Sequence, residues 1–298
     1  MNFTKKILFV LVFLSFFNNS LAGESIKSFD VEVRVNKDSS INVTEKIKYD
    51  FDNLTSGKEL HGLYRDIPYK YRSEWGDYNF EFADVSVNTE NFDFYKYSDK
   101  YLRIDTNPDP DIHVKGVVPY EFRYTVDWAI GYFDDFDEIY WNATGDEWGV
   151  PMGRPNTSVF LPSPAQKVSL RVSCYEGRKG STEQCEYIMV VKDGLVEEIK
   201  FIASRELGAE EGMTVAIGFP KGLVYEPTRI EKLKKIFCDN KIYLLPVFTF
   251  FMMLYLWHTR GRDPKGKGLI IPQYDVPYGL TPMELALIYR NKVKTKLV

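Results

Sequence analysis

The chain has 298 residues, of which 44% are hydrophobic and 15% aromatic, and it carries a formal net charge of −4 with a pI near 5.6. This length allows one large domain or two ordinary ones beside membrane segments, and the acidic balance excludes nucleic acid as the main partner, because phosphate binding needs a concentrated basic face. The 20 Tyr and 21 Phe favour strands over helices, since aromatic side chains fit a pleated, half-buried surface.

The first 22 residues have the pattern of an export signal. Lys5 and Lys6 precede an apolar run over residues 7–17, and Ser20, Leu21 and Ala22 give the small-x-small sequence that signal peptidases cleave. We therefore predict a signal peptide over residues 1–22. An uncleaved anchor helix is the alternative interpretation, and both export the residues that follow.

Alternating hydrophobic residues dominate the next part of the chain. Apolar side chains recur at every second position from Phe29 to Val35 and, apart from Glu45, again from Ile41 to Tyr49, and turn-forming residues occupy positions 36–40 between them. This pattern predicts a β-hairpin. We expect further strands at residues 78–87, 92–97, 101–106, 118–126, 138–142, 157–161, 166–174, 186–191, 196–201 and 213–219.

Many short strands separated by turn signals are typical of an antiparallel β-sandwich. The fold class expected is therefore mainly β, with an extracytoplasmic sandwich followed by one transmembrane helix. The Pro- and Gly-containing segment at residues 150–155 offers a seam. A division there gives a β-rich subdomain over residues 23–150 and a second β-sandwich subdomain over residues 151–227.

The C-terminal part combines helical and apolar patterns. Residues 228–241 have helical character and form the expected juxtamembrane helix, and residues 242–257 form the expected transmembrane helix. This apolar run is shorter than the ~20 residues that comfortably span a bilayer, and a buried core helix is the alternative. Because export places the β-rich part outside, we expect a plasma-membrane protein with residues 258–298 in the cytoplasm. Thr281 and Glu284 predict a capped helix there.

Three cysteines fit an exported chain. Cys174 and Cys185 flank a turn-rich segment, and a hairpin there brings two such positions within disulfide reach, so we predict that they are bonded. Cys238 is left over beside the membrane. No second Cys pair or His cluster supplies further ligands, and no metal site or cofactor is predicted.

Catalytic motifs are missing from the sequence, so no catalytic residue is predicted. Two polar and aromatic segments are candidates for ligand binding. Residues 61–68 group a His, an Arg and an Asp in one expected loop, where an ion pair that locks the loop is the structural alternative. Residues 140–148 carry two Trp beside acidic residues, where burial in the core is the alternative to stacking on sugars. The candidate ligand-binding residues are His61, Arg65, Asp66, Trp141 and Trp148.

Five segments in a fixed order give the chain a family resemblance. They lie at residues 38–45, 61–68, 140–142, 261–264 and 277–282. With them the chain resembles the predicted membrane protein family called domain of unknown function 2207. The resemblance implies a signal peptide, an exported β-rich domain, a membrane helix followed by Gly-Arg-Asp-Pro, and a cytoplasmic segment. It implies no activity and no catalytic residues.

These observations favour a membrane-anchored protein of a bacterial cell envelope that acts as a binding or interaction module. Its expected partners are the lipid bilayer and either another envelope protein or a cell-surface glycan. The alternative is an envelope enzyme or transporter component that acts on cell-surface material. A further alternative is a signalling anchor in which the segment at residues 261–264 and the helix after Thr281 contact a cytoplasmic partner.

Overall fold

The computed structural model describes residues 23–51, 61–73, 76–109, 111–241, 244–261, 268 and 279–290. Of these described residues, 48% lie in strands and 18% in helices, so the protein is mainly β. The chain divides into two compact units, Met1–Lys241 and Ile242–Val298. The expected signal peptide lies outside the described residues, as do residues 262–264 and 277–278 of the two C-terminal family segments.

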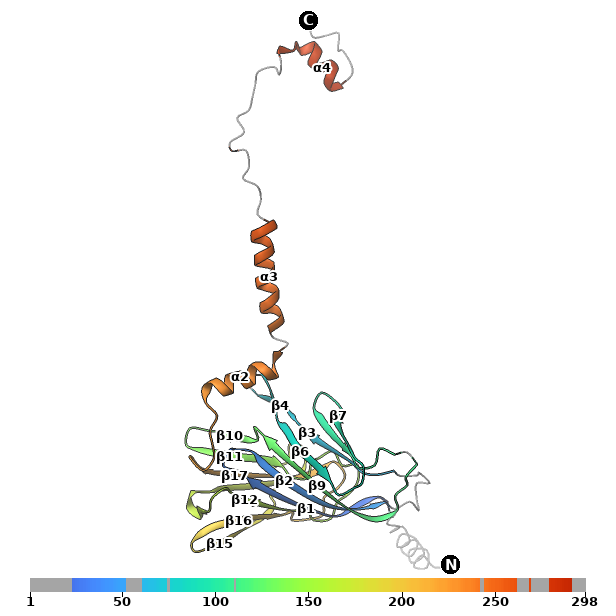
Figure 1. Cartoon of the computed structure of the whole chain (residues 1–298), viewed down its shortest axis with the longest axis vertical. Coiled ribbons are helices and arrows are strands. Elements are labelled where there is room, and N and C mark those ends of the chain that lie inside the picture. The colour runs from blue at the N-terminus through green and yellow to red at the C-terminus, as the bar shows by residue number, and fades with distance from the viewer. Residues whose placement is uncertain are drawn as a thin grey trace, which may run out of the picture. The chain divides into compact units, whose positions relative to one another are not determined.

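The largest sheet of the first unit has eight strands (Figure 1). Seven follow one another in the order β13-β16-β12-β1-β2-β9-β6, and β15 pairs with β16. Their bounds are β1 Ser25–Val35, β2 Ile41–Phe51, β6 Glu81–Val87, β9 Gly116–Asp127, β12 Asn156–Phe160, β13 Ala165–Gln166, β15 Glu186–Lys192 and β16 Leu195–Ile202.

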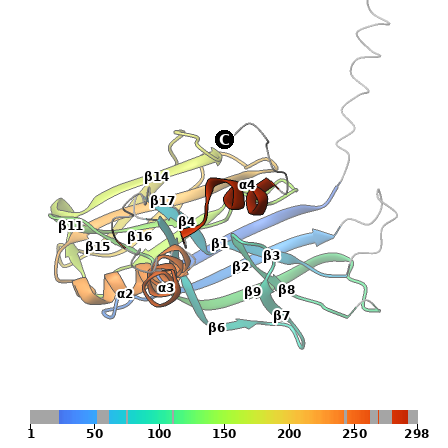
Figure 2. The same ribbon diagram turned by 90° about the horizontal axis from the view of Figure 1, so that it is seen from above.

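Three smaller sheets complete the β structure. A four-stranded sheet has the order β10-β11-β17-β14, a three-stranded sheet the order β3-β8-β7, and β4 pairs with β5. Figure 2 labels β11, β17 and β14 of the four-stranded sheet. The bounds are β3 Tyr64–Pro68, β4 Lys70–Ser73, β5 Gly76–Asn79, β7 Asp93–Lys96, β8 Tyr101–Asp105, β10 Ile130–Tyr132, β11 Phe136–Asn142, β14 Arg171–Arg178 and β17 Glu211–Pro220.

The hairpin predicted at the start of the domain is confirmed. Strands β1 and β2 are antiparallel, with Val33 opposite Val43 and Val35 opposite Ile41. Their alternate side chains are buried, as the period of two requires. Ser39 in the connecting turn has a φ of 72°, a left-handed conformation that lets the chain reverse direction.

Three predictions from the pattern were wrong in detail. Strand β12 runs parallel to β1, although all strands were expected to be antiparallel. Side chains alternate in the same way in parallel and antiparallel strands, so the sequence pattern does not specify the direction of a strand. The strand expected at residues 166–174 is interrupted by a 3-10 turn, Lys167–Ser169. The loop expected at residues 61–68 contains strand β3.

One hydrophobic core gathers buried side chains from both larger sheets. It includes Phe29 and Val33 of the eight-stranded sheet and Ile139 and Val215 of the four-stranded sheet. Strands from before and after residues 150–155 share each of these sheets, because β1 pairs with β12 and β11 pairs with β17. The division into two subdomains at residues 150–155 stays a prediction. A domain boundary there would cut through both sheets.

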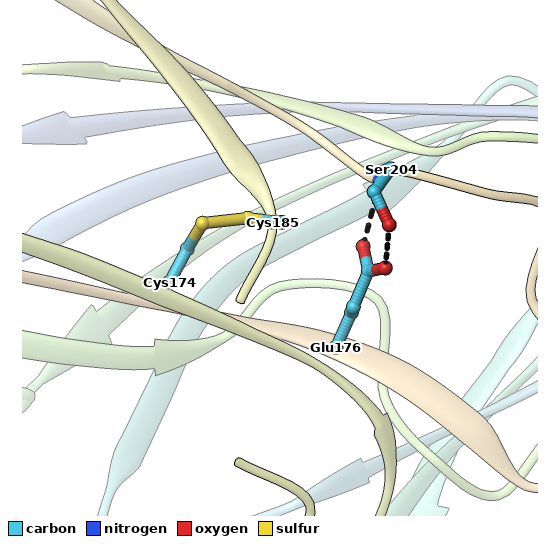
Figure 3. The surroundings of a disulfide bond; sticks show 4 residues. All are labelled: Cys174, Glu176, Cys185 and Ser204. Carbon is cyan, nitrogen blue, oxygen red and sulfur yellow. Dashed lines mark hydrogen bonds between the residues drawn. A yellow bond between two sulfur atoms is a disulfide. The ribbon is translucent and has the colours of Figure 1, made fainter. Parts of the chain in front are cut away.

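A disulfide bond joins Cys174 to Cys185, with Cα atoms 5.5 Å apart (Figure 3). Cys174 lies on β14 of the four-stranded sheet, and Cys185 directly precedes β15 of the eight-stranded sheet. Beside it, Glu176 accepts hydrogen bonds from the backbone N–H and the hydroxyl of Ser204. The crosslink therefore ties together strands of two different sheets.

Helix α2, Arg229–Asp239, closes the first unit. Thr228 caps its first turn: its hydroxyl accepts a bond from the Glu231 backbone N–H, and the Glu231 carboxylate accepts one from Thr228.

The second unit contains α3, Leu244–Arg260, and α4, Pro282–Arg290. Glu284 accepts bonds from both the backbone N–H and the hydroxyl of Thr281, so the capped helix predicted there is confirmed. By length and composition, no single helix among the described residues qualifies as a membrane span. The pair α2 and α3 meets the same criteria when taken together, as a bent pair that fits either a broken span or a re-entrant loop.

Candidate functional site

Arg65 and Trp148 meet inside the protein rather than at its surface. The Arg65 side chain is 2% exposed, and its guanidinium carbon lies 5.6 Å from the Trp148 ring centre. Its Nε and Nη2 atoms donate to the two carboxylate oxygens of Glu45 over 2.7 and 2.8 Å, and Nη1 donates to the Asp66 carbonyl. Tyr124 donates to the same Glu45 carboxylate over 2.6 Å. All three nitrogens of the guanidinium therefore donate to partners inside the protein.

The electrostatics of this pair favour a permanent ion pair. Burial alone lowers the pKa of Arg65, but the attraction of the Glu45 carboxylate outweighs burial, and the pKa of Arg65 is raised above its ordinary value. Gly145 packs on the guanidinium with a φ of 77°, and a Cβ atom at this position would lie 2.6 Å from Nη1 of Arg65. The site is thus packed around a charged arginine.

Asp66 and His61 lie elsewhere. Asp66 follows Arg65 on β3 and points to the opposite face, where its carboxylate accepts two bonds from Arg103 over 2.7 and 2.6 Å. His61 lies before β3, with Nδ1 3.2 Å from the Ile112 carbonyl oxygen and its ring 4.8 Å from that of His113. These contacts fix the two side chains in separate surroundings.

Trp141 is a core residue. It is 3% exposed and stacks on Phe80 with ring centres 6.0 Å apart. Trp148 is 7% exposed, and its indole N–H donates to the Thr144 carbonyl. Of the five candidate side chains, the structure therefore brings together only those of Arg65 and Trp148, and the five do not line a common cleft.

A different set of aromatic residues surrounds a surface cleft of about 240 Å³. We call it the tyrosine cleft, because four Tyr from four strands line it together with Asn142 and Asp146. Tyr140 is 57% exposed and Tyr71 is 38% exposed. The four tyrosines are Tyr71 of β4, Tyr101 of β8, Tyr140 of β11 and Tyr175 of β14.

Strand alternation places these side chains. On β11, Trp141 points into the core, so Tyr140 and Asn142 on either side of it point outward. Tyr175 lies opposite Thr214 in the pairing of β14 with β17, and Thr214 also lines the cleft. The candidate residue Trp141 and the surface residue Tyr140 are thus neighbours in one strand.

Hydrogen bonds hold the polar side of the tyrosine cleft. The Asn142 amide donates to Asp146 over 3.0 Å, and the Gly145 backbone N–H donates to the Asn142 oxygen over 3.0 Å. Tyr101 donates to Glu147. Burial and this Glu147 bond raise the pKa of Tyr101, and burial also raises the pKa of Tyr140. Both phenols therefore stay protonated at neutral pH.

A family model decides the relationship of the chain to known proteins. The model described as "Predicted membrane protein (DUF2207) N-terminal domain" matches residues 25–219. The chain belongs to this family. The match includes the buried Arg65 and Glu45 pair, the disulfide and every residue of the tyrosine cleft. The family description names a predicted membrane protein and no activity.

Other comparisons find only distant likeness. No curated protein sequence matches the chain. An M1 zinc metallopeptidase from Deinococcus radiodurans is 9% identical with a TM-score of 0.38, covering 66% of this chain and 42% of the peptidase. Yeast LTA4 hydrolase is 11% identical with a TM-score of 0.37, covering 66% of this chain and 29% of the hydrolase. The chain thus spans less than half of either structure, and such TM-scores do not establish a common fold.

The sequence contained a signal for the tyrosine cleft. In a strand that ends in Tyr140, Trp141 and Asn142, burial of the tryptophan requires its two neighbours to face outward. The contributions of Tyr71, Tyr101 and Tyr175 had no such signal, because three further strands bring them to the same place.

Proposed function

We propose that this protein is a membrane-anchored binding module of the cell envelope, and that the tyrosine cleft binds a cell-surface glycan. The observation that supports this proposal is the combination of four tyrosine rings with an amide and carboxylates in one open cleft. Sugars present apolar ring faces that stack on aromatic rings, and hydroxyl groups that bond to amides and carboxylates. Binding sites commonly combine such aromatic walls with a few placed polar groups.

Membrane anchorage by α3 is part of the same proposal. The helix has 17 residues, no acidic residue and no lysine, and its described side chains are all exposed. At 1.5 Å per residue it is ~26 Å long, close to the ~30 Å of a bilayer core. Such an exposed apolar helix is stable where lipid replaces water around it. Export would then place the β-rich unit, arranged as a β-sandwich, outside the plasma membrane.

An enzymatic role has less support. The sequence-based case for an envelope enzyme depended on His61, Arg65, Asp66 and the two tryptophans sharing one site. In the structure, Arg65 instead pairs with Glu45, Asp66 pairs with Arg103, and both tryptophans are buried. Side chains held in this way are positioned for structure rather than for reaction.

The proposal is tested by retention of envelope polysaccharide on immobilised full-length protein in detergent. Tyr140→Ala combined with Tyr175→Ala removes two stacking surfaces, and at about 0.5–1.5 kcal/mol per aromatic contact we expect roughly tenfold weaker retention. Tyr187→Ala is the matched control, because Tyr187 is 46% exposed but does not line the cleft. Equal retention by the cleft variant and the control, or no retention by the natural chain, would refute the assignment.

A further inference from the structure

Helix α2 has an unusual distribution of polar and apolar residues. Its side towards the β structure carries charged groups beside the half-buried Ile236. Lys235 is 5% exposed, and its ammonium lies 2.6 Å from Glu81 and 3.2 Å from Asp239. Asp239 also accepts a bond from the Asn79 backbone N–H over 3.0 Å. Lys232 pairs with Glu226 over 2.7 Å. Charged groups thus fix the inner face of the helix.

The outer face of α2 is apolar. Ile230 is 79% exposed, Leu233 is 55% exposed and Phe237 is 58% exposed. Their spacing of three and four residues places them on one side of the helix, within an arc of about 60°. We call these three residues the α2 stripe. A helix normally turns such a stripe towards the core, so its exposure indicates a surface that another apolar phase covers.

Basic residues border the α2 stripe. Arg229, Lys234 and Lys241 are all exposed. Helical geometry places Arg229 and Lys234 beside the stripe, and Lys241 follows the end of α2 at Asp239. The acidic residue nearby, Glu231, is engaged in the cap of the helix and accepts bonds from Thr228 and Tyr225. An apolar stripe with basic flanks is the pattern of a helix that lies in a membrane interface and attracts anionic lipid headgroups.

We propose that α2 binds the bilayer surface, with Ile230, Leu233 and Phe237 inserted among the lipids and the basic flanks contacting anionic headgroups. Chain continuity favours lipid over a protein partner, because the apolar helix α3 begins at Leu244, shortly after α2 ends at Asp239. The inference rests on anchorage by α3 and adds a second membrane contact. The charged inner face of α2 would then hold the β-rich unit close to the lipid surface.

The test uses full-length protein reconstituted in vesicles of phosphatidylcholine with or without phosphatidylglycerol. In a Cys238→Ser background, a polarity-sensitive fluorophore is attached at Leu233→Cys, at Phe237→Cys, or at Val117→Cys as the control. Val117 is 54% exposed and lies on β9, so its exposure matches that of Leu233. Circular dichroism checks that each labelled chain remains folded.

We expect blue-shifted emission at positions 233 and 237, with quenching by nitroxide-labelled lipids, and neither effect at position 117. The double substitution Arg229→Gln and Lys234→Gln should lower the equilibrium constant for binding of α2 to the surface of anionic vesicles by about fivefold for each removed charge. Protein that enters the vesicles but leaves positions 233 and 237 in water overturns the inference while anchorage by α3 stands. Shielding from water without quenching by lipid also overturns it, since a protein then covers the stripe. If the chain does not enter vesicles, both the anchorage by α3 and the surface binding of α2 are overturned.

Discussion

Arg65 illustrates how one residue type supports opposite interpretations. Its position between His61 and Asp66 in the sequence suggests a ligand site, whereas its side chain bonds to Glu45 in the core. The decisive information is that residues 64–68 form a strand, because Arg65 and Asp66 then face opposite sides. Glu45 could not be paired with Arg65 from the sequence, since its strand is contributed by the preceding hairpin.

Replacing Arg65 with Met should destabilise the domain severely. The substitution leaves the Glu45 carboxylate buried without its counter-charge, which costs about 3–5 kcal/mol in comparable pairs. Arg34→Met is the matched control, because Arg34 pairs with Glu32 at the surface, where both side chains are more than 40% exposed and the expected loss is about 1 kcal/mol or less. Urea unfolding of both variants in detergent measures the difference. Similar losses would mean that the buried pair contributes no special stability.

Individual elements differ in how well the sequence specifies them. The first hairpin and the helix at Pro282 were predicted, because alternation and a capping box are local signals. The parallel pairing of β1 with β12 was not, since its partners are separated by more than a hundred residues. Strand β3 was also missed, because its five residues include one buried arginine and end in a proline.

The disulfide should stabilise the joining of two sheets. The bond closes a loop in the unfolded chain and so lowers the entropy of that state. Removing it with Cys174→Ala and Cys185→Ala should therefore lower the free energy of unfolding by about 2–4 kcal/mol. Cys238→Ser is the control, because Cys238 is exposed and unbonded, and its expected effect is about 0.5 kcal/mol or less. Unfolding of the three proteins without reductant provides the comparison. If the double variant matched the control, the crosslink would have no role in stability.

At the scale of the whole molecule, composition and alternation predicted a mainly β protein, and the family resemblance is confirmed by the match over residues 25–219. The tyrosine cleft was not predicted as a site, because β4, β8, β11 and β14 each contribute one ring. No local pattern specifies which four strands approach one another. Within the aromatic segment at residues 140–148, Tyr140, Asn142 and Asp146 line the cleft, whereas both tryptophans are buried.

The assignment of a glycan to the tyrosine cleft depends on the side of the membrane that the β-rich unit occupies. Thiol labelling in spheroplasts measures this directly with a membrane-impermeant maleimide and two variants in a Cys238→Ser background. Val117→Cys marks the β-rich unit, and Ile288→Cys marks α4, where Ile288 is 71% exposed. The account predicts labelling of position 117 in intact spheroplasts and of position 288 only after permeabilisation. Labelling of position 288 in intact spheroplasts, with position 117 protected until permeabilisation, would contradict it.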